Sequence, residues 1–140
     1  MDQQNIDKII SNYLSKNIKF SEENIFAVKL SLLDTLGCIY NASTYEDPMR
    51  FATRGVYGAN TNPFKILGGM QSSNEIARYF SILTRWFDYN DTFLAKEWAH
   101  PSDNSGTAFA YFINHKEKNI SQFLQSIIQM YEIQGSLALG

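Results

Sequence analysis

The 140-residue sequence has a single cysteine, few prolines and no strong excess of charge of either sign. One cysteine, Cys38, allows neither a disulfide framework nor a zinc or iron–sulfur site made of cysteines within this chain. It lies in an apolar run, so we expect it to be buried. Twelve Lys and Arg alternate along the chain with fourteen Asp and Glu, and this pattern does not indicate a nucleic-acid partner.

Long uninterrupted apolar runs are also missing. Four charged residues break every stretch before it reaches the roughly 20 apolar residues that a membrane-spanning helix requires; they are Asp34, Arg78, Arg85 and Glu132. Residues 1–5 have neither the basic nor the apolar region of a signal peptide. We therefore expect a cytoplasmic protein that binds neither membranes nor nucleic acids.

What the sequence does contain is apolar residues at helical spacing, enough for one domain with a core. The spacing predicts helices at about 2–15, from 22 onward, from 73 to the polar cluster at Asp88, at 107–113, and from 122 to the end. Ser21, Ser72 and Ser121 are the expected N-caps. Between them we expect a short helix near 48–57 and an extended segment at 64–67. The fold class is therefore all-α with at most a short extended segment.

The predicted helix that follows Ser21 carries two apolar stripes. One contains Val28 and Ile39, and the other contains Phe26 and Leu33. A helix that is apolar on most of its circumference is typical of a central, buried position. Asp34 is expected to hydrogen-bond to another helix end, because a buried carboxylate needs a partner. The second stripe has no evident partner, so the isolated chain should expose it, and further parts of the core are expected outside this chain.

Residues 88–106 are the most unusual segment, because acidic side chains, a histidine and hydroxyls alternate with aromatic residues. Three chemical interpretations are open. Asp88, Asp91 and His100 could bind a divalent metal ion. Ser102 or Thr92 could be a nucleophile, although neither lies in a G-x-S-x-G motif. In the third interpretation, His100, Asp88 and Thr92 transfer protons and hydrogen-bond a hydroxycarboxylic acid.

A purely structural interpretation of the same segment competes with these. Asp88 and Asp91 would form turns at the end of a helix, and His100 with Pro101 would make a rigid turn. Asn104 would then cap the next helix.

The segment resembles the D-[FY]-[ND]-D-T…H-P-S signature of the MmgE/PrpD family, with Asp-Tyr-Asn-Asp-Thr at 88–92 and His-Pro-Ser at 100–102. Two further blocks support the resemblance, Leu-Asp-Thr-Leu-Gly-Cys at 33–38 and Tyr-Glu-Ile-Gln-Gly at 131–135. The insert before His100 is more similar to 2-methylcitrate dehydratase than to cis-aconitate decarboxylase, two activities within this family. The chain departs from the family at Ser81-Ile82, where relatives often have Asn-Gly.

The resemblance implies that residues 1–140 form the first part of a helical domain, with the remainder and a smaller α+β domain lying downstream. The implied reaction eliminates water from a tricarboxylic hydroxy acid, such as 2-methylcitrate, without a cofactor, a metal ion or an iron–sulfur cluster. Asp88, Thr92 and His100 match catalytic positions, and Asp91 and Ser102 are candidates for binding the substrate. The family's basic residues for the carboxylates lie beyond Gly140. A homodimer is also implied.

Two alternatives to the dehydratase remain. The chain could be a non-catalytic helical module for binding or oligomerisation, left by truncation of an enzyme gene. It could instead be part of an enzyme similar to cis-aconitate decarboxylase.

Overall fold

The computed structural model describes residues 3–54, 72–115, 117 and 119–140, and in these residues the chain is built from helices. They are α1 (Gln3–Leu14), α2 (Glu22–Ser43), α3 (Glu46–Ala52), α5 (Ser73–Arg85), the 3₁₀ helix η1 (Pro101–Asn104), α6 (Ser105–Asn114) and α7 (Ile120–Leu139). The described residues form no strand, only an isolated antiparallel bridge between Phe93 and Ala99. The predicted all-α class is confirmed.

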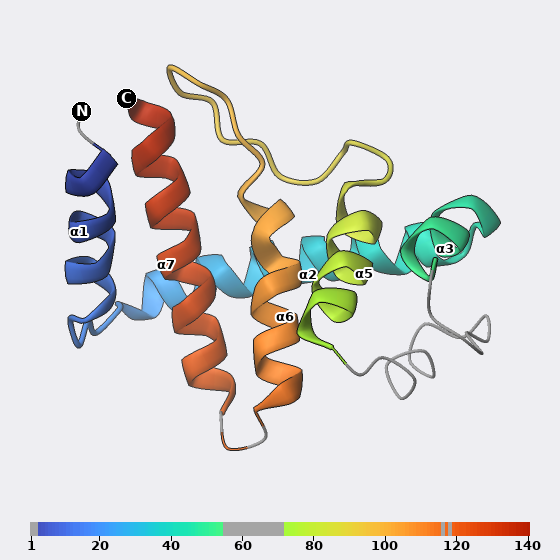
Figure 1. Ribbon diagram of the computed structural model, residues 1–140, viewed down its shortest axis with the longest axis horizontal. Coiled ribbons are helices and arrows are strands. Elements are labelled where there is room, and N and C mark those ends of the chain that lie inside the picture. Colours follow the sequence, from blue (N-terminus) through green and yellow to red (C-terminus); the bar gives the residue numbers. More distant parts are fainter. Residues whose placement is uncertain (1–2, 55–71, 116, 118) are drawn as a thin grey trace.

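The helices form two layers (Figure 1). α5, α6 and α7 lie next to one another, and α2 crosses behind them and contacts α5 and α7. α3 packs on α5 near the C-terminal end of α2, whereas α1 lies beside α7 at the opposite end. The loop from residue 86 to residue 100 leaves α5 and extends over one end of this layer toward the C-terminal end of α7. It contains most of the residues predicted to form a site.

Reciprocal capping boxes start three of the helices. In each, the N-cap side chain accepts a hydrogen bond from the backbone N–H three residues later, and that later side chain accepts one from the N-cap backbone. Ser21 and Ser72 are N-caps, as the sequence predicts. Ser121 is not, because Asn119 forms the box of α7 with Gln122 and the helix begins at Ile120.

The middle of the chain agrees only in part with the prediction. The helix expected near 48–57 is α3, which begins at Glu46 and ends at Ala52. It starts earlier because Glu46 and Asp47 occupy its first turn, where carboxylates interact favourably with the helix dipole. The extended segment expected at 64–67 lies outside the described residues.

Two hydrophobic clusters form the core. The first joins α2, α3, α5 and α6 around Tyr79 and Leu83, and the second joins α2 and α7 around Val28 and Ile127. Phe109 of α6 packs against both, with its ring stacked on Phe80 at 4.6 Å between ring centres. One continuous core therefore holds α2 behind the other helices.

α2 is central but buried on one face only, which corrects the expectation of a fully buried helix. Its buried residues are Val28, Thr35, Cys38, Ile39 and Ala42. The second stripe is exposed, as expected of an isolated chain: Phe26, Leu30, Leu33 and Tyr40 are each more than half accessible to solvent. Asp34 lies on this exposed side, so the buried and partnered carboxylate predicted for it is wrong.

The same helix also changes the conclusion about membrane spans. α2 is long and apolar enough, by length and composition alone, to cross a membrane, although Asp34 interrupts it. The central helix of a water-soluble core meets the same criterion, so this property does not by itself indicate a membrane protein.

Candidate active site

The loop that carries the predicted site is held against the C-terminal end of α7. Phe93 and Ala99 exchange two backbone hydrogen bonds of 2.8 and 3.0 Å, which closes the loop into a narrow hairpin. The backbone N–H of Glu97 donates to the carbonyl of Ala138 at 3.0 Å. Carbonyls in the last turn of a helix lack partners within the helix, so this bond stabilises both the loop and the helix end. The Phe93 ring packs against Gly135.

Gly135 provides a test of this docking. A Cβ added there would lie 3.5 Å from the Phe93 ring, an ordinary van der Waals distance, so Gly135→Ala should be tolerated. Gly135→Leu should push the ring away and cost about 1–3 kcal/mol, because a packed interior cannot accept the extra volume. Hydrogen exchange at the Phe93 and Ala99 amides would report the loss of the hairpin. Equal exchange rates in both variants would show that Phe93 does not hold the loop.

One ring nitrogen of His100 forms a hydrogen bond, and the other has no hydrogen-bond partner among the described residues. Its Nδ1 lies 2.8 Å from the backbone carbonyl oxygen of Asp91 and 3.5 Å from Oγ1 of Thr92. A carbonyl can only accept a hydrogen bond, so Nδ1 must carry the hydrogen. In the neutral ring Nε2 then has the lone pair, and this atom is buried without a hydrogen-bond partner among the described residues. The Trp98 ring meets the imidazole edge-on at 5.4 Å between ring centres.

Asp91 and Ser102 lie beside His100. The Asp91 carboxylate accepts a hydrogen bond from the backbone N–H of Ser102 at 3.1 Å. The Ser102 hydroxyl, only 1% exposed, accepts one from the amide of buried Asn90 at 2.7 Å, and the same amide donates to Asp103 at 3.0 Å. These contacts place Ser102 in a structural network, and no bond among the described residues joins it to an imidazole that could activate it as a nucleophile.

Asp88 is arranged differently from the other predicted residues. It has a left-handed backbone conformation with φ of 58°, and its carboxylate forms an ion pair with Arg85 at 2.8 Å. Arg85 also approaches Asp103, at 3.8 Å. Asp88 is exposed and lies at the start of the loop, whereas the contacts of His100 come from Asp91 and Thr92. Arg85, which would otherwise attract an anionic ligand, is already paired with two aspartates.

The other two sequence blocks converge on Asp91. Burial, with smaller contributions from the carboxylates of Asp34 and Asp91, raises the pKa of the Cys38 thiol on α2. Burial and the carboxylate of Asp91 also raise the pKa of the Tyr131 phenol on α7. Asp91 thus lies within electrostatic reach of Cys38 on α2 and of Tyr131 on α7.

Neither a metal site nor a caged acid–base pocket is evident in this part of the molecule. No three His, Cys, Asp or Glu side chains gather as metal ligands in the described ranges. Of the aromatic residues in the loop, Trp98 contacts His100, while Tyr89 instead stacks on Phe87. Both Tyr89 and Trp98 remain more than half exposed, although His100 itself is buried.

Sequence reasoning did not single out three residues that the structure places in or beside the network: Arg85, Asn90 and Tyr131. Asn90 and Tyr131 stand inside the motif blocks, and that position was the only signal for them. The expected capping role of Asn104 is not observed, because its side chain instead donates to Pro101 and Gln134.

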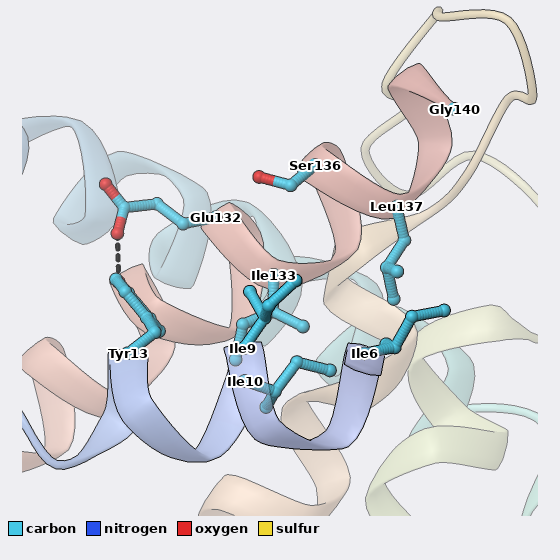
Figure 2. A pocket seen from close by; sticks show the side chains of 9 residues that line it. All are labelled: Ile6, Ile9, Ile10, Tyr13, Glu132, Ile133, Ser136, Leu137 and Gly140. Atoms are coloured by element: carbon cyan, nitrogen blue, oxygen red, sulfur yellow. Dashed lines mark hydrogen bonds between the residues drawn. The ribbon is translucent and has the colours of Figure 1, made fainter. Parts of the chain in front are cut away.

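An apolar groove lies between α1 and α7 (Figure 2). It has a volume of about 380 Å³ and is lined mainly by aliphatic side chains: Ile6, Ile9, Ile10, Ile133 and Leu137. Its one carboxylate, Glu132, is bound by the Tyr13 hydroxyl. None of the predicted site residues lines the groove, so it is separate from the candidate active site.

Comparison with known proteins points to the same family as the sequence motifs. The family model described as the MmgE/PrpD N-terminal domain matches residues 9–140. The chain is 32% identical to the probable 2-methylcitrate dehydratase of Saccharomyces cerevisiae, over 99% of its own length and 30% of that protein. It is 35% identical to 2-methylcitrate dehydratase of Escherichia coli, over 77% of the chain and 25% of the relative. An alkylcitrate dehydratase from a fungus is 30% identical over 79% of the chain and 25% of that enzyme.

Proposed function

Because the chain belongs to the MmgE/PrpD family, we propose that it forms the N-terminal helical part of a hydro-lyase that eliminates water from a hydroxytricarboxylic acid. These relatives are named for 2-methylcitrate or alkylcitrate, which supports a citrate-like substrate with an alkyl group. The chain spans only about 30% of the yeast relative's length, so the rest of the active site is proposed to come from sequence outside it.

The observation that carries the proposal is the state of His100. Its Nδ1 is anchored on a backbone carbonyl, and its Nε2 is buried and unpartnered among the described residues. A base of this kind can take the proton from a carbon next to a carboxylate. The electrons of that C–H bond form the double bond, and the hydroxyl on the neighbouring carbon leaves with a proton as water. We assign proton transfer to His100 and propose Thr92, whose hydroxyl lies beside its ring, as a contact to a substrate carboxylate.

The remaining predicted residues have supporting roles in this proposal. Asp88 would orient the leaving hydroxyl, because its carboxylate, ionised and paired with Arg85, can accept a hydrogen bond but has no proton to donate. Asp91 and Ser102 would bind the substrate beside His100, and the hydrogen bond from the backbone N–H of Ser102 to the Asp91 carboxylate would hold them together.

The charges of the segment predict that the chain alone is inactive. A tricarboxylate brings about three negative charges, and binding it is costly unless cationic groups meet it. Residues 88–106 offer Asp88, Asp91, Asp103 and Glu97 against only Lys96 and the titratable His100, and the neighbouring Arg85 is already paired with aspartates. Residues 1–140 should therefore show no measurable dehydration of 2-methylcitrate, whereas the chain extended by the sequence encoded after codon 140 should show it.

Ultraviolet absorbance of the conjugated acid product measures turnover by residues 1–140 and by the extended chain. Robust turnover by residues 1–140 would contradict the incomplete site. An extended protein that associates but has no turnover would favour the non-catalytic module instead, and release of carbon dioxide would favour a decarboxylase.

Location and assembly remain part of the proposal. A cytoplasmic location stays a proposal, since the relative from Yarrowia lipolytica is named as a mitochondrial enzyme. A homodimer is proposed, and the exposed apolar stripe of α2 is compatible with burial against further protein.

A further inference from the structure

Asn90 is a buried polar side chain that joins the start of the loop to η1. It is only 3% exposed, and its amide nitrogen donates to the Ser102 hydroxyl at 2.7 Å and to the Asp103 carboxylate at 3.0 Å. Its amide oxygen accepts a longer bond from Arg85 at 3.4 Å. The Ser81 hydroxyl of α5 donates to the Asp103 carbonyl at 3.0 Å, so η1 is itself fixed to α5. Both polar atoms of the Asn90 side chain therefore have partners from other segments.

The neighbours of Asn90 require an amide at this position. A carboxylate such as that of Asp103 can only accept hydrogen bonds, and a guanidinium such as that of Arg85 can only donate them, so the side chain between them must do both. The family signature allows asparagine or aspartate here. Beside Asp103, an aspartate would bring two carboxylates to hydrogen-bonding distance, where like charges repel and neither group has a hydrogen to donate. Asp103 therefore makes asparagine the suitable residue in this chain.

The contacts of Asn90 reach His100 through the adjacent residue, Asp91. The Asp91 carboxylate accepts from the backbone N–H of Ser102 at 3.1 Å, and the Asp91 carbonyl accepts from Nδ1 of His100 at 2.8 Å. Residues 90 and 91 are thus held against residues 102 and 103 by three hydrogen bonds of their side chains, of which Asn90 supplies two. The carbonyl that orients the imidazole belongs to this fixed pair of residues.

We propose that Asn90 is a positioning residue for His100. It fixes residues 90 and 91 against η1, so that the Asp91 carbonyl keeps the hydrogen of the imidazole on Nδ1 and the lone pair on Nε2. Without the amide, two of the three bonds are lost and the Asp91 carbonyl can move away from Nδ1. The ring can then rotate and carry its hydrogen on either nitrogen. The catalytic meaning of this role rests on the proposed function, whereas the tautomer can be observed without any substrate.

The first test compares Asn90→Asp with the unaltered chain by nitrogen-15 NMR of the His100 ring, at a pH where the ring is neutral. In the unaltered chain, the two ring nitrogens should give the well-separated shifts of a single Nδ1–H form. In Asn90→Asp, which keeps the shape but has no N–H to donate, the two shifts should approach each other. In the extended enzyme the loss should appear in kcat more than in KM and reach about tenfold or more, because displacing a reacting group by about 1 Å can cost about 100-fold.

The reciprocal exchange should restore the single tautomer. When Asn90→Asp is combined with Asp103→Asn, the amide at position 103 donates to the carboxylate at position 90, and the Ser102 hydroxyl can rotate to donate as well. The carboxylate at position 90 also lies beside Arg85, where an opposite charge is favourable. Restored shifts would show that the direct contact between positions 90 and 103, and not general stability, sets the tautomer.

Asn114→Asp is the matched control. The Asn114 amide makes the same kind of bond, to the Ser73 hydroxyl at 2.8 Å, but it joins the end of α6 to the start of α5 and lies outside the loop. This variant adds the same charge and should leave the His100 shifts unchanged. If Asn90→Asp does not fold, Ser102→Ala removes only the hydroxyl that accepts the 2.7 Å bond and should move the shifts in the same direction.

Unchanged His100 shifts in folded Asn90→Asp, or in Ser102→Ala where that variant does not fold, would overturn the proposal. An equal change in Asn114→Asp, or no recovery in the double variant, would also overturn it. Because these spectra need no turnover, they separate failure of this proposal from failure of the proposed dehydratase activity. An altered tautomer in an extended protein whose unaltered form has no turnover would support the positioning role and contradict the reaction.

Discussion

Replacing Gly106 by alanine should lower the free energy of unfolding by about 3 kcal/mol, because α5 and α6 approach too closely to admit a side chain at this position. A Cβ on Gly106 would overlap with the backbone carbonyl oxygen of Ala77 and the hydroxyl of Ser81, and it would lie 2.9 Å from the Ser81 nitrogen. Ser81 could rotate, but it would then lose the bond that its hydroxyl donates to Asp103 at 3.0 Å. The Ala77 carbonyl is part of a helix and cannot move without displacing α5.

Gly37→Ala is the control for this substitution. Gly37 also lies within a helix, α2, but a Cβ there would meet no atom within 4 Å. Alanine should stabilise the chain by about 0.5–1 kcal/mol, since glycine is a poor helix former. The melting temperatures of the two variants, measured by circular dichroism, should therefore shift in opposite directions. Gly106→Ala should melt about 10 °C below the unaltered chain. A melting temperature for Gly106→Ala equal to that of the unaltered chain would show that α5 and α6 leave room for a side chain at this position.

The second large effect concerns His100. In the extended enzyme, His100→Ala should reduce turnover by about 100-fold or more, the usual scale for the loss of a positioned acid or base. The reason is that neither side chain that contacts the His100 ring, the Thr92 hydroxyl or the Trp98 indole, can act as a base in place of Nε2. The rate of formation of the conjugated acid measures the effect.

His115→Ala is a matched control for the histidine. His115 has the same kind of anchor, with Nδ1 at 2.7 Å from the carbonyl of Tyr111, but it lies at the C-terminal end of α6 and not in the loop. It should leave turnover within about twofold, because a surface substitution away from the site changes little. If His100→Ala retains full turnover while the protein is folded, His100 has no catalytic role and the proton-transfer step must be assigned elsewhere.

The sequence alone predicted those features that depend on neighbouring residues. Ser21 and Ser72 could be recognised as N-caps because a capping box is complete within four residues. Helical periodicity predicted α1 and α5, since each carries one apolar stripe; α5 buries its stripe in the core, whereas the stripe of α1 lines the groove beside α7. The prediction of Ser121 as the last N-cap failed because Asn119, two residues earlier, can also cap, and the side chain of Gln122 accepts a hydrogen bond from the backbone N–H of Asn119.

The motif blocks identified the loop of the candidate site but could not predict its geometry. The sequence placed Asp88 and His100 in one predicted site. In the folded chain the Asp88 carboxylate instead forms an ion pair with Arg85, and Nδ1 of His100 hydrogen-bonds to the backbone carbonyl of Asp91. This difference arises from the left-handed conformation of Asp88, which sends the chain away from α5 in a direction that residue types do not specify.

What the sequence by itself determined is the helical class, the starts of α2 and α5 at their capping boxes and the segment that carries the candidate chemistry, because each follows from interactions within a few residues along the chain. Only the tertiary structure decided that Asp34 is exposed and that Gly106 lies against Ala77. It also decided which nitrogen of His100 is free and that the loop is held against the C-terminal end of α7. Each of these depends on how helices cross and where a loop is held, and therefore on contacts between residues far apart in the sequence.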